Sequence, residues 1–317
     1  MTHDPHERPR AGRRQFLEMS ALGALSVGAL ATCSGRSGSP KAPGSSPGSS
    51  PLDVENIWKN GAFHHATVDA RNAPKGSLRA RLDGQWRTLK LVDLPDAFVL
   101  WSLNERKDRL RGLAEHGFSK RDLAGPHNAC VATYGGPPRD SAVSLNTAYK
   151  GMGFLPREDK LAATIAMLKK ARRDIEAGHV TTGAGATSPM NQMLAKLRIL
   201  AKLYSDPAHF DRRKQISLEL FSKPTFFTHT FLNMLANPIA SASFLAYPTF
   251  ELRTIPQLLH PKDPALTHQE RLTIDYVNTI HDFVHSGDGT QRIACIYHII
   301  EVFEDTPTDR AHGKRLV

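Results

Sequence analysis

The sequence has few cysteines, no internal repeat and no apolar run that could span a membrane as a helix. Its most apolar stretch, Met19 to Ala31, is shorter than the about 20 residues that such a helix needs. No period of about 20 to 50 residues recurs along the chain. The glycine-rich stretch Gly183 to Pro189 has no lysine and no preceding strand, which excludes a Walker loop and a dinucleotide-binding fingerprint.

The first 33 residues contain the parts of a secretory signal, with a basic start, a short apolar run and small residues at the end. Arg13 and Arg14, followed by Phe16 and Leu17, resemble the bacterial twin-arginine signal. Glu18 stands where that family usually has a lysine. The resemblance implies export of a protein that has already folded in the cytoplasm. An ordinary secretory signal with two adjacent arginines is the alternative.

The end of the signal resembles the lipobox of bacterial lipoproteins. In Leu30-Ala31-Thr32-Cys33 the cysteine would be acylated and become the new N-terminus, although Thr32 departs from the usual Gly, Ala or Ser. The alternative is cleavage after Ala31, which would leave a soluble protein. Residues 34–51 are almost entirely Ser, Gly and Pro, and such a segment stays flexible. A tether of this kind favours the lipid anchor at Cys33.

These features predict three regions, with a signal peptide over residues 1–33, a flexible tether over 34–54 and a globular domain over 55–317. They also predict a protein of the periplasm or cell envelope, held to a membrane by its lipid. The globular region is long enough to bury a core of its own.

The chain is basic, with a formal net charge of +10. Residues 1–33 hold four arginines and three acidic residues, so the remainder carries +9. Most basic residues alternate with acidic ones in helical patterns, which is typical of solvated helix faces. No nucleic-acid partner is expected for an exported protein. An anionic lipid surface or an anionic envelope polymer is the more natural partner.

Strand-like and helical patterns follow one another along the globular region. Apolar residues alternate from 78 to 82 up to Asp83-Gly84, and this dipeptide between strand-like runs favours a β-hairpin. A helix is expected over 95–117. Residues 128–134 fit a short strand, whereas 138–156 have the pattern of a long loop.

From Pro156 onwards the helical period dominates. Thr267 and Glu270 form a capping box that starts one of the helices. Residues 292–303 fit either a buried strand or a buried helix. The other expected segments are helices over 156–178, 188–204, 208–222, 224–237 and 267–287, an irregular stretch over 238–264 and a polar tail over 306–317. The predicted fold class is α+β, with an early β-hairpin region and a mainly helical C-terminal part.

The strongest candidate site is His281-Asp282-Phe283-Val284-His285. Two histidines four residues apart share one face of a helix and could both bind a metal. The segment resembles the H-E-x-x-H helix of zinc metalloproteases, with Asp282 in place of the glutamate as general base. Zinc or iron would suit such ligands, and His298 or Glu301 could supply a third ligand. The alternative is an amphipathic helix whose histidines flank the core.

A second candidate pairs Cys130 with His179. Their spacing resembles that of small cell-wall cysteine hydrolases, which implies attack of a thiolate, activated by imidazole, on an amide bond. Cys130 lacks the Asp-Cys-Ser setting of that family, and a predicted helix leads into His179. The alternative is a buried cysteine and a helix-capping histidine. Cys130 and Cys295 could also form a disulfide, or both could be buried free thiols.

Other residues of interest have simpler explanations. Gly183 to Pro189 could bind an anion at a helix N-terminus, but a loop with Ser188 as helix cap explains it as well. His64 and His65 could be metal ligands, although neighbours on a strand point to opposite faces. His229 lies among phenylalanines and is expected to be a hydrogen-bonded core histidine.

Two classes of function therefore compete. One is a metal-dependent enzyme or metal-binding protein that uses His281 and His285. The other is a non-catalytic binding or structural lipoprotein that works through its basic surface. A cysteine hydrolase is the third interpretation.

Overall fold

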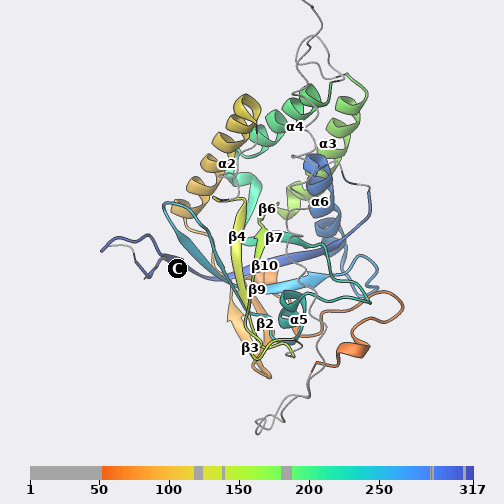
Figure 1. The fold of residues 1–317 in the computed structure, drawn as a ribbon, viewed down its shortest axis with the longest axis vertical. Coiled ribbons are helices and arrows are strands. Elements are labelled where there is room, and N and C mark those ends of the chain that lie inside the picture. Colours follow the sequence, from red (N-terminus) through yellow and green to blue (C-terminus); the bar gives the residue numbers. More distant parts are fainter. Residues whose placement is uncertain are drawn as a thin grey trace, which may run out of the picture. The chain divides into compact units, whose positions relative to one another are not determined.

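The computed structural model describes residues 52–117, 124–137, 140–179, 188–285, 287, 289–309 and 312–317 (Figure 1). The described residues belong to one compact unit, Gly48–Val317. Arg13, Arg14 and Cys33, with the signal peptide and most of the tether, lie outside the described residues. Among the helices that the structure describes, none combines the length and the apolar character of a membrane span.

The centre of the domain is a large antiparallel sheet with the strand order β5-β4-β8-β9-β10-β7-β6 and with β11 added to β10. Only Met152 separates β5 from β6, so the two ends of the sheet are consecutive in the chain and the sheet curls. The strands are β4 (Asn128–Thr133), β5 (Asn146–Gly151), β6 (Gly153–Pro156), β7 (Phe210–Glu219), β8 (Ala240–Ser243), β9 (Phe250–Leu259), β10 (Ile293–Glu304) and β11 (Lys314–Arg315).

The helices pack on this sheet and on one another. They are α2 (Asp96–His116), α3 (Glu158–Glu176), α4 (Pro189–Leu203), α5 (His229–Ala236) and α6 (His268–His285), with short 3-10 turns η1 (Val54–Asn56), η2 (Ala73–Lys75) and η4 (Pro207–His209). In Figure 1, α3, α4 and α6 lie towards one end of the main sheet, and β2, β3 and α5 towards the other. Ser188 caps α4 by accepting the Asn191 N–H, and Thr267 and Glu270 form the expected capping box of α6.

A second, small sheet has the order β1-β2-β3, from β1 (Val68–Asp69), β2 (Ser77–Leu82) and β3 (Gln85–Lys90). The expected hairpin is confirmed. Asp83 and Gly84 both have positive φ, 49° and 78°, as a two-residue turn that matches strand twist requires. Leu78, Ala80 and Leu82 face inward and pack near Ile255 of the main sheet. The opposite face of this sheet is exposed.

The α+β class is confirmed, and several segment predictions need correction. Residues 210–219, expected to be helical, form β7 between β10 and β6. The pattern misleads because β7 buries polar residues, with Gln215, Ser217 and Glu219 all within the structure. Residues 292–303, which were ambiguous, form a buried strand.

The stretch 238–264, expected to be irregular because of its prolines, holds β8 and β9. Pro256 is tolerated because it lies beyond the last residue of β9 that pairs with β8. Backbone groups of alternate strand residues point the same way, so the nitrogen of Pro256 has the direction of the Leu258 N–H, which points to His65 and not to β10. The missing N–H of Pro256 therefore removes no ladder bond. The expected loop over 138–156 contains β5 and β6.

Candidate functional site

The two histidines of the predicted metal site lie on one face in the last turns of α6. The ring centroids of His281 and His285 are 5.0 Å apart. Burial of the ring, together with the neighbouring His281, lowers the pKa of His285 to about 4, although the residue as a whole is exposed. His285 is therefore neutral at pH 7, as a metal ligand must be.

Asp282, the proposed general base, is held by neighbouring groups. It is buried, and Arg292 and Arg172 approach its carboxylate to 3.4 and 4.0 Å. His281 Nδ1 lies 3.2 Å from the same carboxylate. A Cβ added to Gly287 would lie 1.7 Å from Asp282 Oδ1, so the backbone packs directly on the carboxylate. Asp282 thus joins α6 to α3 and to the start of β10, which is a structural role.

A third ligand is not gathered around these histidines. Within the described ranges, no cluster of three or more His, Cys, Asp or Glu side chains has the arrangement of a metal site. His298 lies buried in β10, where its Nε2 donates to Gln257. Glu301 binds Arg253 and Arg315. Both residues that the sequence offered as third ligands therefore have other partners.

Cys130 and His179 lie in different surroundings. Cys130 is an exposed free thiol of β4, directly opposite Tyr149 on β5 and Ser243 on β8. His179 follows the end of α3, where its N–H donates to the carbonyl of Asp174. No hydrogen bond or ion pair of the described residues joins the two side chains. The cysteine–histidine pairing stays a prediction.

Cys295 is the opposite of Cys130, because it is buried on β10. Both cysteines are free thiols, so the disulfide does not form, and only one of the two is buried. Burial raises the pKa of Cys295 to about 12, while Tyr297 and Lys150 oppose this effect. A thiol with such a pKa is protonated at neutral pH and is a poor nucleophile.

The remaining histidines have defined partners. His64 is exposed, and its Nδ1 lies 2.7 Å from the buried carboxylate of Asp263. His65 points inward, where it lies against the Met234 carbonyl and accepts the Leu258 N–H. His229 is half exposed and contacts Asp140 at 2.7 Å, so it is not the expected core residue. For the glycine-rich loop, residues 180–187 lie outside the described part of the chain.

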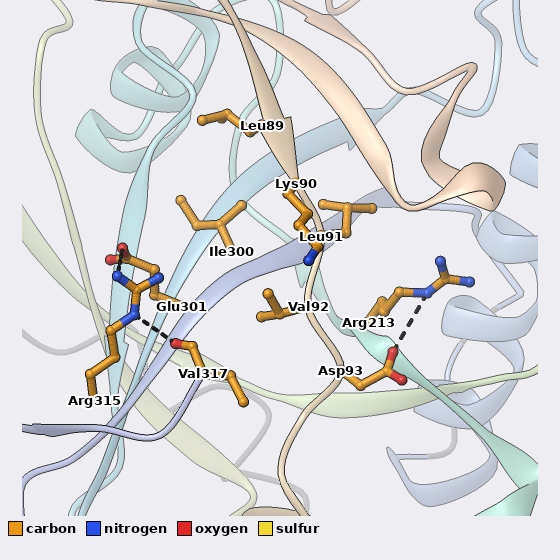
Figure 2. A pocket seen from close by; sticks show the side chains of 10 residues that line it. All are labelled: Leu89, Lys90, Leu91, Val92, Asp93, Arg213, Ile300, Glu301, Arg315 and Val317. Atoms are coloured by element: carbon orange, nitrogen blue, oxygen red, sulfur yellow. Dashed lines mark hydrogen bonds and ion pairs between the residues drawn. The ribbon is translucent and has the colours of Figure 1, made fainter.

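The described surface contains an open groove of about 810 Å³, in the size range of ligand sites. It lies between the segment that follows β3 and the C-terminal residues beside β10. Three cations border it (Figure 2): Lys90, Arg213 and Arg315. The other lining residues are Leu89, Leu91, Val92, Asp93, Ile300, Glu301 and Val317.

The cations of the groove differ in their partners. Arg315 binds Glu301 at 3.2 Å, and Arg213 lies 3.8 Å from Asp93 (Figure 2). No ion pair or hydrogen bond is found for the ammonium of Lys90 among the described residues. Lys90 therefore remains available to an anion.

No local sequence pattern predicts this groove. Its cations come from three distant stretches of the chain, which only the fold brings together. A partial signal was present in the hairpin, where Arg79, Arg81, Arg87 and Lys90 occur close together outside any helical pattern.

Comparison with known proteins gives no assignment. No protein-family model, no curated protein and no solved structure matches the chain.

Proposed function

We propose that this protein is an exported, lipid-anchored envelope protein whose folded domain binds anionic envelope material without catalysing a reaction. The observation that carries the proposal is the groove bordered by Lys90, Arg213 and Arg315, with Lys90 open to a ligand. The signal and the lipobox-like Cys33 support the location.

The charge of the domain supports the same function. An excess of positive charge raises the local concentration of anions at the surface, and each cation near an anionic surface adds about 1 kcal/mol of attraction. A domain on a flexible tether can reach such material while it remains anchored.

Two variants test the proposal. Replacement of Cys33 with Ala should release the protein from the membrane fraction, because the acylated residue is lost. Unchanged fractionation would exclude the lipid anchor. The Lys90→Gln variant should bind isolated cell envelopes more weakly, whereas Lys170→Gln, which removes an exposed lysine of α3, should bind as the parent does. Equal losses in both variants would refute a role for the groove.

A second function, metal binding by His281 and His285, is supported by their ring separation of 5.0 Å and by the lowered pKa of His285. The two imidazoles could hold zinc or iron, with water completing the coordination. Elemental analysis of the chain purified without chelators should find about one metal per chain, and His285→Ala should lose it. The same metal content in His285→Ala and in the parent would eliminate this site.

A further inference from the structure

The exposed face of the small sheet carries cations that continue into the groove. Side chains of alternate residues share one face of a strand. On β2 this exposed face carries Arg79 and Arg81, and on β3 it carries Trp86 and Lys90, since Arg81 pairs with Trp86 and Ser77 with Lys90. The side chain of Trp86 is 45% exposed, so this face is open to a ligand.

Arg213 extends the row beyond the end of β2. Its guanidinium lies 3.6 Å from the position that a Cβ of Gly76 would occupy, one residue before β2 begins. We call the row Arg81, Arg79, Lys90 and Arg213 the basic strip. It ends in the groove, which Lys90 and Arg213 line.

The strip has a regular spacing. Residues two apart in a strand are separated by about 7 Å, which is the axial distance from Arg81 to Arg79. The pair Ser77–Lys90 comes one such step further on. The backbone positions of Arg81, Arg79 and Lys90 are therefore about 7 Å apart along the strand direction, given the rise per residue of a β-strand.

The arginines of the strip are held in place before any ligand binds. The guanidinium of Arg79 lies over the ring of Trp86 at 5.2 Å from its centroid, a cation–π arrangement. Arg81 Nε donates to the Gly84 carbonyl. Such ordering lowers the entropy lost when an anion binds.

The acids near the strip do not cancel it. Asp69 lies opposite Arg79 but is held by Arg71 through two hydrogen bonds of 2.8 and 2.6 Å. Arg213 lies 3.8 Å from Asp93 and 3.9 Å from Asp211, although Asp211 is bound more closely by Lys214 at 2.8 Å. The strip therefore keeps a positive balance, with Lys90 and Arg79 as its most available cations.

We propose that the basic strip binds a linear polyanion of the phosphodiester type, with successive phosphates aligned on Arg81, Arg79 and Lys90 and the chain end entering the groove. A polymer of glycerol phosphate, whose phosphates are separated by a three-carbon bridge, has a repeat that fits this spacing. Trp86 offers an apolar surface to the bridging carbons. This inference rests on the proposed function and names the class of ligand.

The test uses the full chain and a fluorescent poly(glycerol phosphate) oligomer in a polarisation titration. The oligomer should bind more tightly than glycerol 3-phosphate, and its affinity should fall as salt rises because counterions are released. Arg79→Gln and Lys90→Gln should each weaken binding about five-fold, the effect of one cation near an anionic surface. The single variant Lys170→Gln on α3 removes the same charge elsewhere and should change binding little.

Two double variants distinguish the effect of the position of a cation from the effect of the net charge. Thr88 lies directly opposite Arg79 on the exposed face, so Arg79→Gln/Thr88→Arg restores a cation at the same step and should recover binding. Gln85 lies at the turn end of β3, opposite Leu82 and off the exposed face. Arg79→Gln/Gln85→Arg therefore restores only the net charge and should stay weak. Equal recovery by both variants would overturn the aligned strip.

Vesicles that contain phosphatidylglycerol distinguish the remaining outcomes. Binding to vesicles but not to the oligomer would refute the polymer and leave the proposed envelope-binding function intact. Binding to neither, together with no loss of envelope binding in Lys90→Gln, would refute both.

Discussion

Acidification should destabilise the folded domain through two buried imidazoles, His65 and His298. Burial lowers their pKa from the ordinary value of 6.5 to about 4 and about 3. In His298 the neighbouring Lys214 lowers the pKa further, while Asp211 acts in the opposite direction. His65 is fixed as the neutral form, because its Nδ1 accepts the Leu258 N–H and its Nε2 lies 3.0 Å from the Met234 carbonyl.

The sign of the effect follows from these values. Below pH 6.5 the unfolded chain binds a proton at each histidine, whereas the folded chain does not until its lower pKa is reached. Stability contributed by each group is therefore present above pH 6.5 and is lost as the pH falls, by about 1.4 kcal/mol per pH unit. At pH 5 each histidine should have removed about 2 kcal/mol from the free energy of unfolding.

Urea unfolding at pH 7 and pH 5 measures this loss. The variant His298→Gln keeps an amide donor for Gln257 but cannot be protonated in this range. Its loss of stability between the two pH values should be smaller than that of the parent by about 2 kcal/mol. His116→Gln removes an exposed histidine at the end of α2 and serves as the control. A parent-like pH dependence in His298→Gln would refute the assignment.

Further substitutions test the packing. Gly287→Ala should destabilise the domain by about 1–3 kcal/mol, because the new Cβ must displace Asp282. Gly112→Ala, in open space on α2, should instead stabilise the domain by up to about 1 kcal/mol. Equal Tm shifts of the two variants would contradict this packing. Arg106→Leu should destabilise the domain in urea unfolding by about 1–3 kcal/mol for each carbonyl left without a donor, since the buried Arg106 guanidinium donates to the Pro126 and Met152 carbonyls. A parent-like midpoint would show that other groups satisfy them. A maleimide should label Cys130 in the folded protein, and Cys295 only after unfolding; labelling of both at one rate would contradict the burial of Cys295.

The sequence predicted the fold best where local signals and packing agree. The Asp83-Gly84 turn and the Thr267–Glu270 capping box both form as expected, because each is decided by neighbouring residues. The prediction from sequence was wrong for β7, which buries Gln215, Ser217 and Glu219 where apolar residues would be expected. These polar groups are accommodated because Glu219 pairs with Lys150 of β5 at 2.7 Å, a contact that depends on the curl of the sheet.

The candidate sites show the same limit. The spacing of His281 and His285 correctly placed two imidazoles side by side, since a helix alone decides that distance. It could not show that Asp282 between them faces Arg172 and Arg292, because those arginines come from other elements. The groove was beyond local reasoning, since β3 contributes Lys90, β7 contributes Arg213 and β11 contributes Arg315. What local reasoning could have noticed is the alternation of Arg79 and Arg81 on one exposed strand face. Charges at a strand's period lie in a row, and a row of cations suits a linear anion better than a compact one.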